Sequence, residues 1–105
     1  MQTGSRDNLA QIIQDGSRWL VSGAMTVAQM NALLAESAAL AAADQVEIDL
    51  KAVLDVDTTA ISLLFEWLRQ AYTRKSKVVF SNLPQNLTSL ATLYGVLELI
   101  PQSTH

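Results

Sequence analysis

The stretch "AVLDVDTTAISLLFEWL", residues 52–68, joins a predicted strand to a strongly apolar helix. The strand is expected to end near Leu50, and a short link follows it. Asp57 and the two threonines after it are residue types that favour helix N-termini, because their side chains accept hydrogen bonds from the first free N–H groups. We therefore expect a helix from about Thr59 to Arg74.

The apolar residues of this helix cover more than one of its sides. On a wheel of ~100° per residue, the stripe that contains Ile61 is expected to face a sheet. The other members of this stripe are Leu64, Phe65, Leu68, Ala71 and Tyr72. Leu63 and Trp67 fall on the opposite side and are i,i+4 neighbours, which predicts an exposed docking patch. Glu66 and Arg74 would form its rim. The alternative is that Trp67 folds sideways onto a neighbouring helix.

Alternating apolar residues predict three strands before this helix, and the first two form a hairpin. The hairpin joins "LAQIIQDG" (9–16) to "SRWLVSG" (17–23) around the turn Asp15-Gly16. The third strand, "QVEIDL" (45–50), leads into the stretch quoted above. Its expected core-facing residues are Val46, Ile48 and Leu50, and those on the partly wet face are Glu47 and Asp49.

Residues 26–40 have the spacing of an amphipathic helix. Thr26 is expected to cap it, and Gln29, three residues later, completes a capping box. The expected core stripe of this helix is Val27, Met30, Leu34, Ala38 and Ala41.

The last part of the chain repeats the strand–helix pattern. "KVVFSNL" (77–83) predicts a strand, and "PQNLTSLATLYG" (84–95) predicts a shorter helix that begins at Pro84 and ends at Gly95. Its expected core stripe is Leu87, Leu90, Ala91 and Tyr94. The order β-β-α-β-α-β-α predicts an α/β fold: a mixed, mainly parallel sheet of about four strands, with helices mostly on one face.

Composition excludes several classes of function. The 105 residues suffice for one domain, 1–105, and they include no cysteine. The single histidine is His105, so thiol catalysis, histidine-based triads, thiolate metal sites and histidine–carboxylate metal sites are excluded, and we expect no metal. The net charge is −3, and the basic cluster Arg74–Lys77 suits a helix C-terminus, so no nucleic-acid partner is expected. No apolar run reaches ~18 residues, which predicts a cytoplasmic protein without direct membrane insertion.

Asp55 and Asp57 could be read as a general acid–base pair. No nucleophile–base pair accompanies them, and an aspartate before a helix is a common cap, so we expect no enzyme activity and no cofactor. The helix N-terminus would instead favour a hydrogen-bond acceptor or a phosphate at the two threonines.

With these elements in place, the chain resembles the STAS domain family over about residues 9–101. The resemblance rests on "VDTTA" (56–60) and "LATLYGV" (90–96). Within the family it is most similar to the small stand-alone MlaB type, a cytoplasmic accessory subunit of bacterial ABC transporters that move phospholipids between membranes. Other relatives are anti-sigma-factor antagonists, which a partner kinase phosphorylates at an Asp-Ser-Ser-Gly motif.

The resemblance implies roles for single residues. Asp57 matches the Asp of the antagonist motif, Thr58 the first hydroxyl, Thr59 the phosphorylated one and Ala60 the Gly. In MlaB-type chains an Asp-Thr-Gly-Gly stretch stands here, and its Thr matches Thr58. Thr59 therefore leaves phosphorylation open, and the Cβ of Ala60 bears on how closely a partner backbone can approach.

Two functions follow from this resemblance. The first is a non-enzymatic adaptor that binds the ATPase of a phospholipid-transporting ABC system, and so reaches the membrane only through that complex. The second is an anti-sigma-factor antagonist switched by phosphorylation of Thr59 or Thr58, with a kinase as partner. In both, the expected partner-binding residues are Asp57, Thr58, Thr59, Ala60, Ser62, Leu63, Glu66, Trp67 and Gln70.

Overall fold

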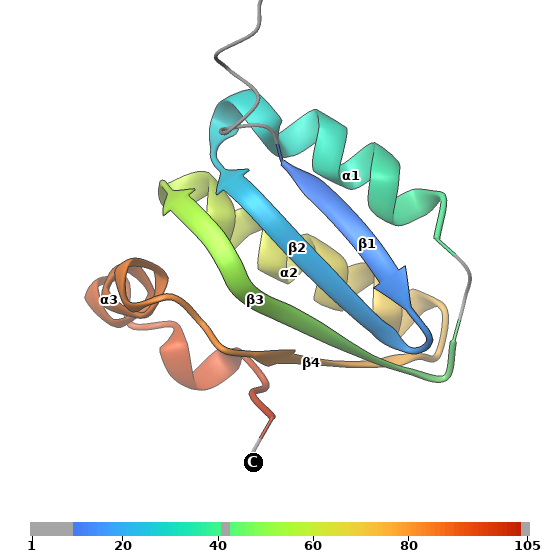
Figure 1. Cartoon of the computed structure of the whole chain (residues 1–105). Helices are drawn as coiled ribbons and strands as arrows, with labels where there is room; N and C mark the ends of the chain where they lie inside the picture. The colour runs from blue at the N-terminus through green and yellow to red at the C-terminus, as the bar shows by residue number, and fades with distance from the viewer. Residues whose placement is uncertain (1–9, 41–42, 104–105) are drawn as a thin grey trace, which may run out of the picture.

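The computed structural model describes residues 10–40 and 43–103 as a four-stranded sheet with helices behind it (Figure 1). The strands are β1 (Gln11–Asp15), β2 (Arg18–Met25), β3 (Gln45–Val56) and β4 (Lys77–Ser81). The helices are α1 (Met30–Ala38), α2 (Thr58–Thr73) and α3 (Gln85–Leu93), with 3-10 turns η2 (Val27–Gln29) and η3 (Leu97–Leu99).

The strand order is β1-β2-β3-β4, with β1 antiparallel to β2 and the remaining pairs parallel. The predicted mixed, mainly parallel sheet is therefore confirmed. The hairpin is also confirmed, and its loop is Gly16–Ser17, because Asp15 still pairs with Arg18. Gly16 adopts φ +63°, a left-handed conformation that a glycine accepts without a Cβ clash.

Strand β3 is much longer than predicted and continues through Val56. Its side chains alternate normally as far as Leu50, but Val53, at an odd spacing, is again in the core. The pairing of β2 with β3 shifts at two points over this stretch, and such bulges return the strand to its partner after an extra residue. As a result, Asp57 is the single residue between β3 and α2, and the predicted short link from Leu50 to the helix does not exist.

The predicted orientation of α2 is wrong. Trp67 is 2% exposed and Leu63 1% exposed, so neither forms an outward patch, whereas Tyr72, assigned to the core face, is 86% exposed. The residues of α2 that lie in the core are Ala60, Leu63, Leu64, Trp67 and Ala71. Trp67 packs edge-on against Trp19 of β2, with ring centroids 5.9 Å apart and planes at 86°.

The physical reason is that α2 has neighbours on both sides. It contacts α1 on one side and α3 on the other, in addition to the sheet beneath it. Ile61, Phe65 and Leu68, which fixed the phase of the predicted stripe, are half-buried at the margin of the core. A helix wedged in this way carries apolar residues over a broad arc, and the centre of that arc lies about one residue step, ~100°, from the predicted one.

The stripes of the other two helices need similar corrections. In α1 the buried residues are Leu33 and Ser37. Of the predicted stripe, Met30 and Leu34 are half-buried, but Ala38 is exposed and Val27, in η2, is 70% exposed; Ala41 lies outside the described residues. In the last helix Leu87 and Ala91 are buried as predicted, but Tyr94 lies beyond the end of α3 and is exposed.

The expected capping box at the start of the first helix is absent, because the Thr26 side chain makes no capping hydrogen bond. The Gln29 side chain instead accepts a hydrogen bond from the Ala10 N–H, at 3.2 Å. About two helical turns further along, Glu36 accepts one from the Ile12 N–H at 2.9 Å. These two side chains therefore fix the helix to the edge of the sheet at β1.

The segment after α3 returns to the sheet beside β4. The Phe80 N–H donates to the Pro101 carbonyl at 2.8 Å, and the Ser103 N–H donates to the Phe80 carbonyl at 2.9 Å. These bonds form an isolated parallel bridge between Phe80 and Gln102. The segment therefore pairs with part of the outer edge of β4.

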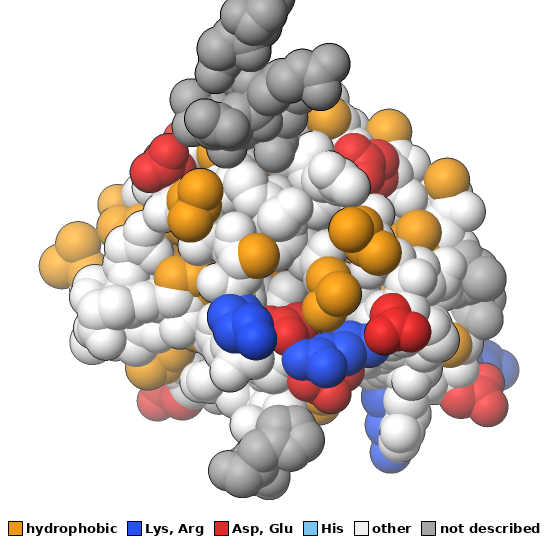
Figure 2. Space-filling view, viewed as in Figure 1, with side chains coloured by type: hydrophobic (Ala, Val, Ile, Leu, Met, Phe, Trp, Pro, Cys, Tyr) orange, Lys and Arg blue, Asp and Glu red, His pale blue; other side chains and the backbone are white. Residues whose placement is uncertain are grey.

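The face of the sheet opposite the helices carries a charged network (Figure 2). Asp49 was expected to be partly wet, but it is only 3% exposed, because Arg18 and Asn82 cover it. Its carboxylate accepts hydrogen bonds from the Arg18 guanidinium, from the Asn82 amide at 3.1 Å and from the Lys51 N–H at 2.8 Å. Burial alone would raise the pKa of Asp49, but these three donors together hold the pKa below its ordinary value of 3.8.

This pKa shift predicts acid sensitivity. A carboxyl whose pKa is lowered by folding adds stability above its unfolded pKa, and that stability is lost as the pH falls through the folded value. We expect Asp49→Asn to lower the free energy of unfolding by about 1–2 kcal/mol at pH 7, a value reduced because Arg18 is half exposed. Urea titrations should show this difference shrinking below about pH 3.8. An equal difference at both pH values would contradict the assignment, and Asp55→Asn is the exposed control.

Candidate partner-binding site

The carboxylate of Asp57 joins two segments at one end of the sheet. One oxygen accepts a hydrogen bond from the Thr59 N–H at 2.8 Å and so caps α2. The other accepts one from the Val27 N–H at 3.0 Å, at the start of η2. Because β2 and β3 are parallel, their carboxyl ends meet at this edge, and Asp57 fastens the turn after β2 to the helix after β3 (Figure 1).

The surroundings of Asp57 favour the ionised form of its carboxylate. Partial burial would raise its pKa, but the N–H groups of Val27 and Thr59 and the Thr59 hydroxyl bring the pKa below its ordinary value. A carboxyl of lowered pKa is a poor proton donor near pH 7, and both oxygens already hold backbone N–H groups. The geometry therefore gives Asp57 a structural role and offers nothing for the acid–base reading, since Asp55 is exposed on the strand.

Around this anchor lies a small surface that we call the α2 N-terminal surface, made of Val27, Thr58, Thr59 and Ser62. Thr58 and Ser62 are exposed, and Thr59 is half-buried with its hydroxyl turned to the Asp57 carboxylate. Val27 contributes the apolar part. Sequence reasoning missed Val27 because helical periodicity assigned it to the core; the contact that reveals it spans 30 residues.

The other predicted partner-binding residues separate into two groups. Ala60, Leu63 and Trp67 are buried and cannot meet a partner in this conformation. Because Ala60 is 0% exposed, its Cβ points into the protein and does not limit how closely a partner backbone approaches. Glu66 and Gln70 are half-buried, and their side chains are linked by a 3.2 Å hydrogen bond.

The exposed side of α2 is mostly polar beyond this surface. Arg69 donates two hydrogen bonds to Glu66, and this donation lowers the pKa of the Glu66 carboxyl. Thr73 donates to the Arg69 carbonyl one turn further on. The outer face of the helix therefore runs from the threonines through an ion pair to the exposed ring of Tyr72, in place of the predicted Leu–Trp patch.

Comparison with known families now places this arrangement. Residues 14–101 match a family model described as "Mlab, STAS domain". The chain belongs to the MlaB-type STAS domain family. Domains of this kind are typically regulatory or adaptor modules. A comparison with curated proteins found no match.

Solved structures show the same fold at low sequence identity. The anti-sigma factor antagonist SpoIIAA in its unphosphorylated form matches with a TM-score of 0.69 and 10% identity, over 91% of this chain and 89% of that chain. A sulfate transporter family protein from Wolinella succinogenes matches with a TM-score of 0.65 and 14% identity, over 86% and 75%. An anti-sigma factor antagonist from Mycobacterium paratuberculosis gives 0.59 and 16%, over 91% and 85%. At such identities the likeness establishes the fold alone.

No helix among residues 10–40 and 43–103 has the length and apolar character needed to cross a membrane. Over the same part of the chain, no group of three or more acidic or histidine side chains is arranged to hold a metal ion.

Proposed function

We propose that this STAS domain is a non-enzymatic cytoplasmic adaptor that binds the ATPase subunit of a phospholipid-transporting ABC system, of the kind that maintains outer-membrane lipid asymmetry. The observation that carries the proposal is the match of residues 14–101 to the MlaB-type family. The α2 N-terminal surface supports it, because it presents the exposed hydroxyls of Thr58 and Ser62 together with an exposed apolar side chain, Val27. Its geometry is fixed from behind by Asp57.

This surface has the features of a small docking site. Val27 is an apolar contact, Thr58 and Ser62 are neutral hydrogen-bonding groups, and the helix N-terminus adds a partial positive charge. A partner that fits these groups would place a hydrogen-bond acceptor at Thr58. Since loops and helix ends carry most binding residues on a rigid scaffold, this edge of the sheet is a better docking candidate than the polar flank of α2.

A second candidate function is an anti-sigma-factor antagonist switched by phosphorylation, and the second hydroxyl, Thr59, favours it. The local geometry makes Thr58 the more accessible target of the two, because Thr59 is half-buried and its hydroxyl bonds to Asp57. A phosphate on Thr59 would bring close to two negative charges against that carboxylate. Phosphate on Thr58 would instead project from the first turn, where the helix dipole favours it.

The first test is substitution of the exposed threonine. Thr58→Asp should keep the fold, because an acidic side chain in the first helical turn is favourable, and should weaken binding to the co-expressed ATPase subunit by more than tenfold. Calorimetry or interferometry with purified proteins measures the affinity. Ser89→Asp, on the exposed side of α3, is the matched control and should bind normally. Tight binding by Thr58→Asp would place the docking site elsewhere.

Intact-mass analysis of the protein from its native host separates the two functions. Under the transporter proposal the chain carries no phosphate, and it co-purifies with an ATPase and a permease. A stoichiometric phosphate on Thr58 or Thr59, together with a kinase as the captured partner, would establish the switching function instead.

A further inference from the structure

A cavity of about 170 Å³ lies at the opposite end of α2 from the proposed docking site. It is bounded by the last turns of α2, the start of β3 and the first part of β4. The residues that line it are Trp19, Ala43, Asp44, Val46, Trp67, Gln70, Ala71, Arg74, Ser76 and Val78. Its volume is roughly that of engineered apolar cavities, about 150 Å³, that bind benzene. A molecule of about the size of a single aromatic ring therefore fits.

Both tryptophans of the chain line this cavity, and both have an unpaired hydrogen-bond donor. Trp19 and Trp67 are more than nine-tenths buried, and the Nε1–H of neither meets an acceptor. A buried indole N–H is normally paired, because leaving it without an acceptor is costly. Neither nitrogen reaches solvent in this structure, so an acceptor inside the cavity would meet them after a turn of the indole rings toward it.

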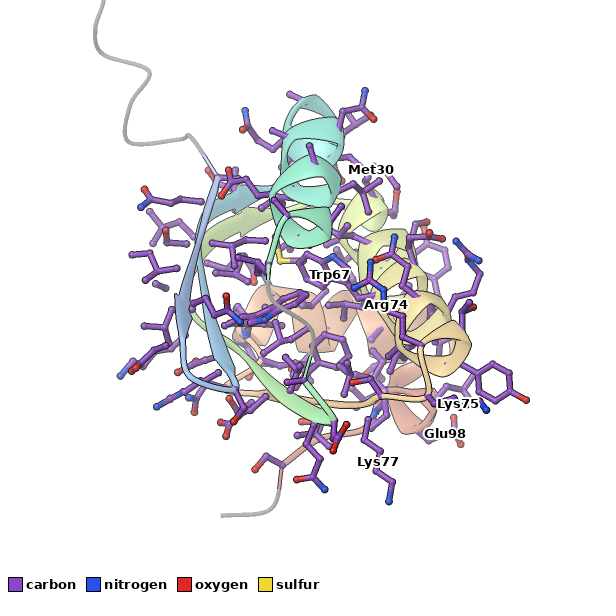
Figure 3. All side chains as sticks on the ribbon, turned by 90° about the vertical axis from the view of Figure 1, so that its right-hand side faces the viewer. Met30, Trp67, Arg74, Lys75, Lys77 and Glu98 are labelled. Carbon is purple, nitrogen blue, oxygen red and sulfur yellow. The ribbon has the colours of Figure 1, made fainter. Side chains whose placement is uncertain are left out.

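The rim of the cavity is charged. Arg74 and Asp44 are exposed and stand there with opposite charges, and neither has an ion-pair partner within 4.0 Å among the described residues. Figure 3 looks onto this side of the molecule, where Trp67 and Arg74 lie close together and Lys77 points away. Val46, Ala71 and Val78 supply apolar walls, and Gln70 and Ser76 add polar side chains to the lining.

We propose that this cavity binds a small carboxylate with an apolar, ring-sized body. The body would lie against the indole rings, and the carboxylate oxygens would accept hydrogen bonds from an indole N–H and from the Arg74 guanidinium. The indole N–H groups and the Arg74 guanidinium can only donate hydrogen bonds, so a ligand that uses them must supply the acceptors and the negative charge. Asp44 opposes this charge from the rim and weakens binding.

The assignment makes the cavity a ligand site distinct from the docking surface. Trp67 lies on the same helix as the docking surface, four residues after Leu63 and ten after Asp57. The cavity and the docking surface nevertheless share no residue. The cavity site therefore does not depend on the proposed transporter role, and ligand binding to it can be measured without a partner protein.

Intrinsic fluorescence tests the proposal directly, because the only two tryptophans of the chain both line the cavity. Titration of the intact protein with sodium benzoate should give a saturable change in emission. Arg74→Gln should raise the benzoate concentration at half-saturation by about three- to tenfold, since it removes a charged donor at a solvent-exposed rim. Asp44→Asn should lower the benzoate concentration at half-saturation by about two- to threefold, because it removes a charge of the same sign as the ligand's. Lys77→Gln, an exposed cation outside the cavity, is the control and should change nothing.

Two further measurements keep the test decisive. Trp67→Phe retains a ring but removes one donor, and with Trp19 as the remaining reporter it should bind benzoate more weakly; circular dichroism confirms that it is folded. Benzylamine, of the same size and opposite charge, should not bind. Saturable binding of benzylamine as tight as that of benzoate would overturn the proposal in favour of a cation site. A purely linear response to benzoate would overturn it altogether.

Discussion

Replacing Trp67 by alanine should lower the free energy of unfolding by about 3–5 kcal/mol, the cost of emptying a large buried aromatic site. The side chain is almost fully enclosed between α2 and the sheet and packs edge-on against Trp19. A domain of this size has a total stability of about 5–15 kcal/mol, so the variant would lose a large part of it. Urea unfolding followed by circular dichroism measures the change.

Tyr72→Ala is the matched control for this result. It removes another large aromatic residue from the same helix, but one that is almost fully exposed, so its effect should stay within about 0.5 kcal/mol. An orientation of α2 like the one predicted from the wheel would give the reverse order, with Tyr72→Ala the damaging change. A wild-type urea midpoint for Trp67→Ala would mean that the tryptophan is not part of the core.

The fold could be predicted because its main signals are local. An Asp-Gly turn between alternating segments predicts a hairpin, and strands separated by helices predict parallel pairing. The sequence "QVEIDL" (45–50) shows its alternation directly, and Val46, Ile48 and Leu50 are indeed buried. The extension of β3 to Val56 was missed because the bulges break the alternation that identifies a strand.

The phase of α2 could not be predicted for a different reason. Periodicity locates the centre of an apolar arc only when that arc is narrow, but α2 contacts the sheet, α1 and α3 at once. The margin of this arc is then as apolar as its centre: Ile61 and Phe65 lie on the margin, and Leu63 and Trp67 lie near the centre. The wheel therefore cannot tell a half-buried residue from a fully buried one. What distinguishes them is the packing of Trp67 on Trp19, a contact between residues 48 positions apart.

One of the two hydrogen bonds that Asp57 accepts at the candidate site could be predicted from local rules in the same way. An aspartate before two threonines predicts a cap, and Asp57 does accept the hydrogen bond of the Thr59 N–H. The same carboxylate also holds the Val27 N–H across the sheet edge, and no local rule predicts that bond. The surface proposed for partner binding therefore depends on a residue that joins two distant segments.

Asp57→Ala should accordingly damage both stability and binding. Loss of the helix cap costs about 0.5–2 kcal/mol, and loss of the Val27 hydrogen bond about 0.5–1.5 kcal/mol, so we expect a decrease of about 1–3 kcal/mol in the free energy of unfolding. With Val27 and Thr58 no longer held in register, affinity for the ATPase partner should fall by more than tenfold even under conditions where the variant is folded.

Two companion variants identify the cause. Asp55→Ala removes an equivalent charge two residues earlier, from an exposed position, and should leave stability within about 0.5 kcal/mol and affinity unchanged. Asp57→Asn should restore much of both properties, because asparagine caps helices as well as aspartate does and its amide oxygen can accept one of the two hydrogen bonds. If Asp57→Ala loses stability but binds its partner normally, the α2 N-terminal surface is a structural junction and the docking site lies elsewhere on the domain. If Asp55→Ala is equally damaging, the effect comes from charge at this edge of the sheet, and the tie between Val27 and Thr59 is not its cause.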